Sequence, residues 1–147
     1  MNNYEVGIKS SWRKFAFDTS VYYSPVFDEV VQVIQGYGET EYVNAGETEK
    51  KGVEVALTWI PAAGLSLGGS YTYSNYTYKD FSEPAFGTNI DRSGNHLPYI
   101  PEHDYSLFAA YVNPTGVYLR ATANSWGEYW MDNANTEKYE GYEFVTD

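Results

Sequence analysis

The chain has no cysteine, few basic residues and no long apolar run, and each absence excludes something. Without cysteine there is no disulfide framework, thiolate metal site or thiol nucleophile. Nine Lys and Arg against 20 Asp and Glu give a formal net charge of −11. This excludes nucleic acid as a natural partner, because phosphate binding needs clustered basic side chains. No run approaches the roughly eighteen apolar residues of a membrane-spanning helix.

Aromatic side chains, in contrast, are abundant. They make up 18% of the 147 residues, with 16 Tyr among them, although the mean hydropathy is −0.49. So many aromatic residues in so polar a chain indicate a surface that is half apolar. Strands in which every second residue is apolar have this property and escape a search for long apolar runs.

Polarity alternates with a period of two along most of the chain, which predicts antiparallel strands. Near the N-terminus, for example, Tyr4, Val6 and Ile8 share one face. The predicted strands cover residues 4–12, 15–24, 48–60, 65–78, 103–112 and 117–127, and a seventh begins near residue 139. Beyond Asn75 the aromatic residues change parity, which predicts either a bulge or the end of the membrane-embedded part of that strand.

The connections between these strands are sorted by length. Short turns lie at residues 12–14, 61–64 and 113–116, and long, polar, acidic segments lie at 26–48, 79–101 and 127–140. Short connections at one end and long ones at the other are typical of a transmembrane β-barrel. The predicted fold is therefore all-β, an antiparallel transmembrane barrel, of which this chain supplies an open fragment of about six or seven strands.

The placement of aromatic residues on the apolar faces supports a membrane barrel. Trp12, Phe15, Trp59 and Tyr111 lie beside the short turns, and Tyr4, Tyr23, Tyr73 and Tyr105 lie at the far ends of the same faces. Tyr4 and Trp12 are eight residues apart, which is about 26 Å of strand. Tilted by roughly 40°, this length projects to about 20 Å, near the ~25 Å apolar band of outer-membrane barrels. We expect these eight residues to form two membrane girdles.

Soluble folds remain an alternative at this level. Lipocalins, jelly rolls and carbohydrate-binding sandwiches also have alternating strands rich in aromatic residues. Charges in mid-strand, such as Glu54, Asp104 and Arg120, suit a wet barrel lumen as well as a soluble exterior. The girdles and the sorted loops favour the membrane barrel, with another outer-membrane barrel (a porin or adhesin) and a soluble carbohydrate-binding module as the rival hypotheses.

Two stretches carry more specific patterns. The first runs from Tyr42 to Glu54 and includes Asn44, Gly46 and Gly52. The second includes Gly94, Asn95, Leu97, Pro98, Pro101 and His103. Both closely resemble motifs in the C-terminal half of the barrel of TonB-dependent outer-membrane receptors. Residues 129–136 and 141–142 are similar to the next loop and strand of that family, so the resemblance covers essentially the whole chain.

These motif residues also have a physical interpretation of their own. Gly46 and Gly52 bracket a predicted strand entry, where the backbone needs positive φ or close approach. Glu54 is expected on the lumen face, where it can pair with a Lys or Arg of a neighbouring strand. Pro98 and Pro101 hold the chain extended before the next strand and end the ladder pairing. We therefore expect the motifs to build the barrel and not to bind ligand.

The resemblance implies an uptake receptor of the Gram-negative outer membrane. Such receptors enclose an N-terminal plug in a barrel of 22 strands. They capture a scarce solute, most often a ferric siderophore, and receive energy through TonB, which contacts an N-terminal segment. Residues 1–147 contain no plug, TonB-contacting segment or final strand, and no signal peptide. We therefore expect one segment of a barrel domain, whose partners are lipid, the remaining barrel and plug, TonB and a small solute such as a metal chelate.

No catalytic, metal or cofactor site is expected. His96 and His103 as a metal or haem pair would lack a third ligand, and a structural role in the motif explains them better. Residues 132–135, Asp-Asn-Ala-Asn, hint at a calcium loop but lack the spacing and glycine of an EF-hand. His103 and Asp104 are adjacent in a strand and so point to opposite faces, which excludes them as a catalytic pair.

Ligand contacts, if this chain makes them, should come from aromatic residues of the long segments. The candidates are Tyr37, Tyr76, Tyr78, Phe81, Phe86, Trp126, Tyr129 and Trp130. Exposed aromatic rings there could stack on a catecholate, a haem or a sugar. Girdle and loop packing is the alternative explanation for the same residues. Because the long segments are acidic, an anionic ferric complex fits them poorly, and the sequence names no substrate.

Overall fold

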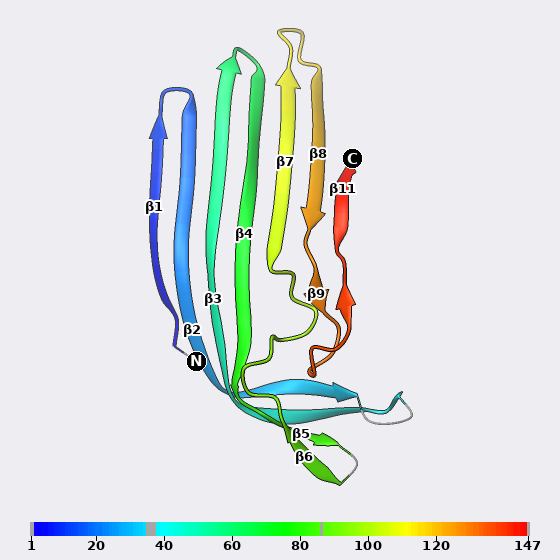
Figure 1. Ribbon diagram of the computed structural model, residues 1–147. Coiled ribbons are helices and arrows are strands. Elements are labelled where there is room, and N and C mark those ends of the chain that lie inside the picture. Colours follow the sequence, from blue (N-terminus) through cyan, green and yellow to red (C-terminus); the bar gives the residue numbers. More distant parts are fainter. Residues whose placement is uncertain (1, 35–37, 86, 147) are drawn as a thin grey trace.

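The computed structural model describes residues 2–34, 38–85 and 87–146, and most of the chain forms one antiparallel sheet (Figure 1). Seven strands lie in the order β1-β2-β3-β4-β7-β8-β11. Their bounds are β1 Tyr4–Trp12, β2 Phe15–Ile34, β3 Thr40–Ala62, β4 Leu65–Asp80, β7 His103–Val112, β8 Tyr118–Trp126 and β11 Tyr142–Thr146. Two small hairpins, β5 (Ser82–Ala85) with β6 (Thr88–Asp91) and β9 (Tyr129–Trp130) with β10 (Lys138–Tyr139), lie outside the sheet.

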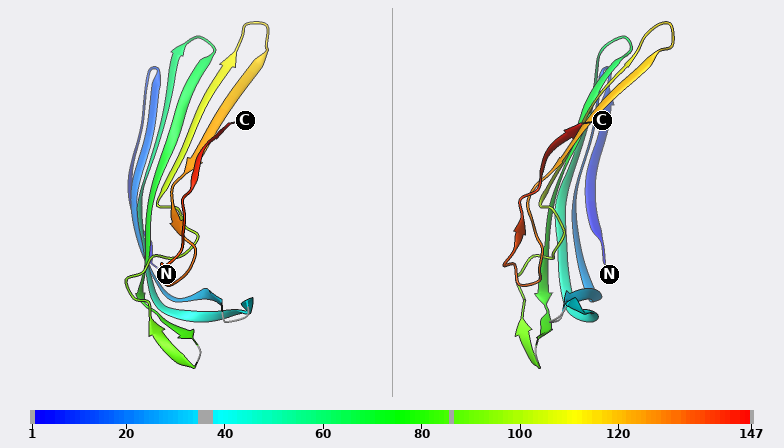
Figure 2. Two further views of the ribbon diagram at one scale, coloured as in Figure 1. Left: turned by 45° about the vertical axis from the view of Figure 1, so that its right-hand side comes forward. Right: turned by 90° about the vertical axis from the view of Figure 1, so that its right-hand side faces the viewer.

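The sheet is an open, curved meander. Strands β1 and β11 form its two edges, and Figure 2 shows the curvature from two sides. Among the described residues no helix is long and apolar enough to cross a membrane. The predicted strands are all present, and the seventh, expected near residue 139, is divided into β10 and β11.

The segment 26–48 was predicted as a long loop, and that prediction is wrong. β2 continues to Ile34 and β3 begins at Thr40, so the two strands pair as one long hairpin from Phe15↔Trp59 to Ile34↔Thr40. The hairpin bends near Asp28, which has a φ of 57°, and its outer part turns across the end of the sheet (Figures 1 and 2). We call this outer part, residues 29–34 and 38–45, the bent hairpin. Its alternation is short and follows two acidic residues, which is why it resembled a loop.

The two faces of the sheet differ in polarity. One, here called the apolar face, carries the apolar residues of each strand, and they are exposed: Val6 is 78% exposed, Trp12 68% and Leu119 64%. The other, the polar face, carries Asp18, which pairs with Lys9 at 2.8 Å. A soluble protein seldom exposes so wide a continuous apolar surface. The apolar face of this open sheet therefore requires an apolar environment.

The buried apolar core lies away from the middle of the sheet, at the end opposite the short turns. Among the described residues it consists of Val31, Val33, Ala45, Tyr78 and Phe81, with Val43 and Leu97 packed against it. The bent hairpin supplies the two buried valines, and the end of β4 supplies Tyr78. The long connections are thus folded onto one another.

The pairing of strand β4 explains why its aromatic residues change parity beyond Asn75. Its pairing with β3 is continuous from Val53↔Tyr73 to Thr48↔Tyr78, so no bulge lies between Asn75 and Tyr78. The register shifts only afterwards, between Thr48 and Glu47. Of the two alternatives, the bulge is thus excluded at this point: the aromatic residues simply move from the apolar face to the polar face.

Candidate ligand-binding site at the loop end

Three connections meet at the side chain of Asn133, which is buried. Its Nδ2 donates to the carbonyl oxygen of Gln32 at 3.1 Å and to Oε1 of Glu83 at 2.9 Å. The hydroxyl of Tyr78 donates to its Oδ1 at 2.8 Å. The backbone oxygen of Asn133 accepts from Nδ2 of Asn95 at 2.8 Å. One asparagine therefore joins the bent hairpin, the β4–β7 connection and the β8–β11 connection.

A second clamp lies two residues further along. Nδ2 of Asn135 donates to the carbonyl oxygen of His96 at 3.0 Å, and Oδ1 of Asn135 accepts from the backbone N–H of His96 at 2.7 Å. The Asn135 amide thus pairs with a backbone as a neighbouring strand would. The Asp-Asn-Ala-Asn stretch and the motif that contains Asn95 and Leu97 form one structural unit.

Asp132 organises the turn that carries these two asparagines. Its Oδ1 accepts from the backbone N–H groups of Thr136 and Glu137 at 2.9 and 3.0 Å, and its Oδ2 accepts from the Thr136 hydroxyl at 2.7 Å. Burial would raise the pKa of this carboxyl, but the donors from Glu137 and Thr136 outweigh it and lower the pKa below its ordinary value. The carboxylate oxygens therefore hold a turn, and no group of three or more His, Cys, Asp or Glu suited to a metal occurs in the described part of the chain.

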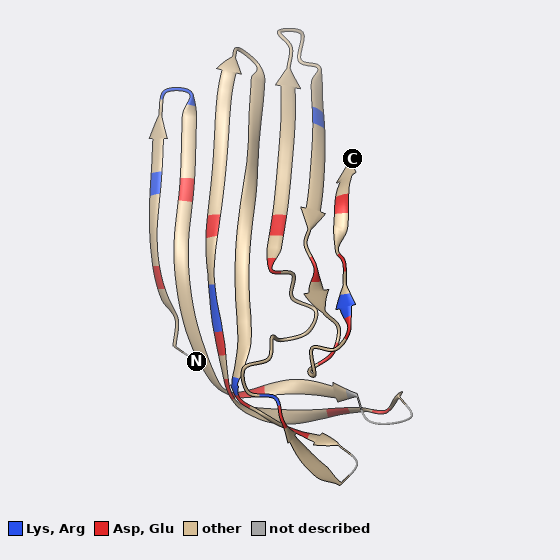
Figure 3. Cartoon of the chain, in the orientation of Figure 1, with Lys and Arg blue, Asp and Glu red and all other residues tan. Residues whose placement is uncertain are grey.

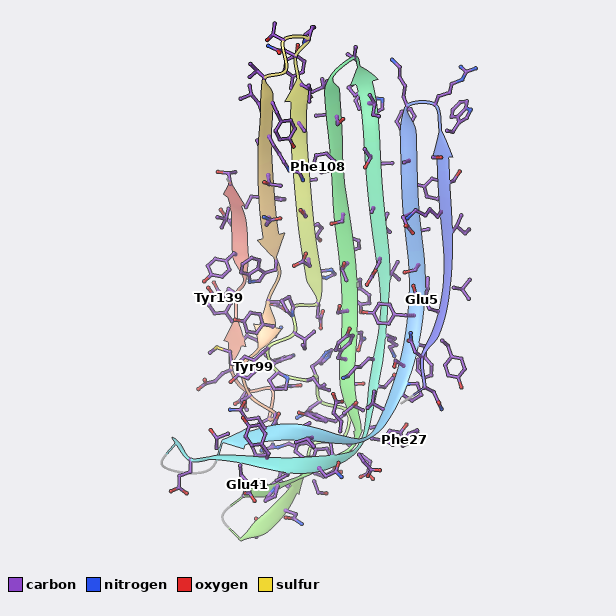
Figure 4. All side chains as sticks on the ribbon, turned by 180° about the vertical axis from the view of Figure 1, so that it is seen from behind. Glu5, Phe27, Glu41, Tyr99, Phe108 and Tyr139 are labelled. Carbon is purple, nitrogen blue, oxygen red and sulfur yellow. The ribbon has the colours of Figure 1, made fainter. Side chains whose placement is uncertain are left out.

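Beside these clamps lies a cavity of about 450 Å³, within the range of ligand sites. Its wall comes from the bent hairpin, the outer ends of β3 and β4, and the two long connections. It includes Glu29, Val31, Lys50, Tyr76, Tyr78, Glu83, Arg92, Tyr99, Met131 and Asp132. In Figure 4, Tyr99 lies next to the bent hairpin that carries Glu41. The cavity lies on the side of the polar face, because Lys50 and Tyr76 belong to that face.

Both basic side chains of the cavity wall are held by carboxylates. Lys50 Nζ lies 2.5 Å from Oε1 of Glu29, whose other oxygen accepts from the Thr48 hydroxyl. Arg92 Nε lies 2.7 Å from Oε2 of Glu83. The ammonium of Lys50 also lies 5.9 Å from the ring centre of Tyr76. The wall is thus polar and aromatic, with its positive charges already neutralised.

A comparison of the sequence with known protein families agrees with this fold. The family model described as "TonB dependent receptor-like, beta-barrel" matches residues 1–147. The chain belongs to this family. Its open sheet is therefore an arc of a receptor barrel, and the apolar face is the outside of that arc.

Curated relatives agree with the family. The chain is 28% identical over 127 residues to the ferrioxamine receptor of Yersinia enterocolitica, a match that covers 84% of this chain and 17% of that protein. It is 30% identical over 107 residues to the ferrichrome outer membrane transporter/phage receptor of Escherichia coli K12, covering 70% of this chain and 13% of that protein. The chain thus spans less than a fifth of the length of these relatives.

Solved receptor barrels share the fold. The ferric citrate transporter FecA in its unliganded form superposes with a TM-score of 0.75 at 15% identity, covering 98% of this chain and 22% of that one. The siderophore receptor PiuA from Acinetobacter baumannii superposes with a TM-score of 0.73 at 21% identity, covering 98% and 21%. Together with the family match, these likenesses show an all-β antiparallel receptor barrel.

The residues predicted to contact ligand lie in different surroundings. Tyr76 and Tyr78 line the cavity, although Tyr78 is almost wholly buried, and Phe81 lies in the buried core beside it with ring centres 4.6 Å apart. Tyr129 and Trp130 line a narrower cleft, where Lys138 lies 4.5 Å from the Trp130 ring centre. Trp126 meets Tyr142 edge-on at 4.7 Å. Tyr37 and Phe86 lie outside the described residues.

Sequence reasoning missed several residues of the cavity wall, among them Tyr99, Arg92 and Met131. Tyr99 stands inside the second motif, to which only a structural role was assigned. It has a φ of 63°, which is uncommon for a residue other than glycine. Asn133 belongs to the Asp-Asn-Ala-Asn stretch that hinted at a calcium loop. Its side-chain amide can donate and accept hydrogen bonds at the same time, and this property is the feature of the sequence that points to a residue joining several connections.

The motif residues make structural contacts. The backbone N–H groups of Gly94 and Leu97 donate to the carbonyl oxygens of Tyr78 and Tyr76 on β4. Pro98 and Pro101 precede β7 as predicted, but the chain between them is not extended, because it turns at Pro98 and Tyr99. A Cβ on Gly52 would lie 2.2 Å from the carbonyl oxygen of Tyr73, so close approach is required there. Gly46 and Gly52 lie within β3 and not at its entry, because that strand begins at Thr40.

The polar motif residues Glu54, His96 and His103 lie in different surroundings. Glu54 lies on the polar face between Ser20 and Thr72, so the predicted cross-strand Lys or Arg partner is not there. The two histidines have separate partners. His96 Nδ1 lies 3.5 Å from Glu102, whereas His103 Nδ1 shares a hydrogen bond of 2.9 Å with the Tyr71 hydroxyl.

The eight predicted girdle residues lie on the apolar face, where Trp12 opposes Phe15 and Tyr111 opposes Leu65. Beside the short turns, Phe15 and Trp59 stack with ring centres 5.9 Å apart. At the far ends, Tyr4 and Tyr23 stack at 6.4 Å. Tyr73 and Tyr105 both lie against the ring of His103, at 5.4 and 6.4 Å, in a row that Tyr71 completes. Aromatic rings thus cluster at both ends of the exposed apolar surface.

Proposed function

We propose that this chain forms part of the wall and the outer loops of a receptor that takes up a ferric siderophore across the outer membrane of a Gram-negative bacterium. The observation that carries the proposal is the cavity at one end of a receptor-barrel arc, enclosed by three connections that clamp one another. The names of the relatives, a ferrioxamine receptor and a ferrichrome transporter, support the class of solute.

In this proposal the short turns face the periplasm and the cavity faces the outside. The apolar face contacts lipid, because its exposed Val, Leu and Phe side chains need an apolar solvent. Tyr4, Tyr23, Tyr73 and Tyr105 form the outer girdle, and Trp12, Phe15, Trp59 and Tyr111 form the inner one.

The partners follow from the open sheet and the family. The unpaired edges of β1 and β11 require further strands, since lipid offers no hydrogen bonds to an open edge. We assign those strands, an enclosed plug and a segment that receives energy from TonB to the receptor of which this sheet is a part. Within this chain, Tyr76, Trp126, Tyr129 and Trp130 remain the proposed aromatic contacts, with Tyr99 added from the cavity wall. Tyr78 is left out like Phe81, because it is buried and its hydroxyl is bonded to Asn133.

Uptake of radioactive iron tests the proposal. The gene that carries these strands is deleted, and cells are starved of iron and supplied with a panel of iron-loaded siderophores. We expect uptake of at least one chelate to disappear, to return on complementation, and to require TonB. A rival porin would instead conduct small solutes without TonB. Unchanged uptake of every chelate, or uptake that persists without TonB, would refute the proposal.

A further inference from the structure

The cavity wall offers no positive charge that is free to meet an anion. Of the described residues that line it, Lys50 and Arg92 are the basic ones, and each is within 2.7 Å of a glutamate oxygen. These pairs are well shielded: the side chains of Arg92 and Glu83 are 19% and 12% exposed, and those of Lys50 and Glu29 are both 23% exposed. Separating either pair to bind another anion would leave a poorly solvated carboxylate behind.

Further contacts keep these glutamates in place. Glu83 also accepts a hydrogen bond from Asn133, and Glu29 accepts one from the Thr48 hydroxyl. The wall includes a third carboxylate, Asp132, which remains ionised because of its backbone donors. The charged groups of the wall are therefore two neutral pairs and one additional negative charge.

The surroundings of the cavity are acidic as well. The three long segments 26–48, 79–101 and 127–140 contain twelve Asp or Glu and three Lys or Arg. Figure 3 shows these acidic residues along the bent hairpin and the connections beside it, at the end of the sheet that holds the cavity. Charges of one sign around a concave site act together on an approaching ligand, attracting one sign and repelling the other.

We infer that this cavity selects ferric chelates without net negative charge, the class represented by ferric tris-hydroxamates, and disfavours polyanionic chelates such as ferric tris-catecholates. Three hydroxamate groups neutralise the charge of ferric iron, whereas three catecholate groups leave the complex with three negative charges. The aromatic and thioether groups of the wall, Tyr76, Tyr99 and Met131, suit an uncharged chelate. This inference rests on the proposed function and adds the charge class of the substrate.

The test is a binding titration on the complete receptor in detergent, followed by quenching of tryptophan fluorescence. The probes are a ferric tris-hydroxamate and a ferric tris-catecholate of similar size. We expect the hydroxamate to bind at least ~tenfold more tightly, with a preference that grows as the salt concentration is lowered and screening decreases. Equal or tighter binding of the catecholate would overturn the inference and leave siderophore uptake intact.

Two variants locate the effect in the cavity. Glu83→Gln releases the guanidinium of Arg92, so we expect catecholate binding to strengthen by roughly three- to tenfold relative to hydroxamate binding. Glu39→Gln removes the same charge at an exposed position of the surrounding acidic segments, outside the cavity wall, and is the matched control, with a much smaller change in preference. A preference that moves equally in both variants would show that the cavity pairs do not select the ligand.

A neutral double variant guards against a folding defect. Glu83→Gln combined with Arg92→Gln removes both partners and leaves the net charge of the wall unchanged, so we expect the wild-type preference to return. If Glu83→Gln and the double variant both lose all binding, the inference fails, because a pair of that importance serves structure and not selection. If the wild-type receptor binds neither chelate and supports no iron uptake, the proposed function itself is refuted.

Discussion

Replacing Asn133 by alanine should weaken the attachment of the outer connections of the barrel to one another without altering the strands. The substitution removes three side-chain hydrogen bonds, to Gln32, Tyr78 and Glu83. The bond from Asn95 to the backbone oxygen of Asn133 persists. A buried hydrogen bond contributes about 1 kcal/mol net, so the three together contribute about 3 kcal/mol to the free energy of local opening. That loss corresponds to an opening equilibrium increased by roughly a hundredfold.

Hydrogen exchange on the complete receptor measures this change. The informative amide is that of Tyr99, which donates to the carbonyl oxygen of Trp130 at 2.8 Å and so joins two connections. Its exchange should accelerate strongly in the variant, whereas the amide of Ile8, in the β1–β2 ladder, should exchange as before. Asn89→Ala, at an exposed position of β6, is the matched control. If Tyr99 exchanges at the wild-type rate, or if Asn89→Ala accelerates it equally, Asn133 is not the residue that holds the connections.

Three further predictions concern the faces, the close packing and the acidic turn. Leu57→Lys, on the apolar face, should destabilise the receptor folded in lipid by about 2–4 kcal/mol if the residue lies near the midplane of the membrane. Ala56→Lys, on the polar face, should be tolerated. Equal effects of the two variants in denaturant titrations would disprove the assignment of faces. Gly52→Ala places a Cβ 2.2 Å from a backbone oxygen and should cost about 1–3 kcal/mol, whereas Gly127→Ala, with a nearest contact of 3.4 Å, should not; unchanged thermal unfolding of the first variant would contradict the close approach. Because the pKa of Asp132 is lowered, its contribution to the stability of the turn is complete above about pH 4 and is lost as the pH falls further. Hydrogen exchange of the Thr136 amide, which donates to Asp132, should become faster as this contribution is lost, and Asp132→Asn should abolish the pH dependence.

Much of the barrel arc was predictable because strand and face are properties of neighbouring residues. A period of two over eight or nine residues determines which side chains share a face, and the pairings Tyr4↔Tyr23 and Phe15↔Trp59 place the predicted aromatic residues side by side. The short turns were equally local, since Gly64 and Gly116 adopt the positive φ that tight turns need.

The bent hairpin was not predictable in the same way. Val31 and Val33 are buried because the end of β4 and the β4–β7 connection cover them, and the sequence around them, with Asp28 and Glu29, has the composition of a loop. The burial of a residue in such a segment depends on partners that are distant in the chain. For the same reason Phe81, expected at the surface as a ligand contact, lies in the core.

By itself the sequence determined the strands apart from the bent hairpin, their two faces, the short turns and, through its motifs, the receptor family, because each of these depends on residues close together in the chain. Only the tertiary structure decided the binding end of the molecule. There Asn133 contacts Gln32, 101 residues away, and Glu83, 50 residues away. Contacts over such separations form when three hairpins fold onto one another. The cavity and its neutralised charges therefore depend on the tertiary structure and cannot be predicted from any single segment.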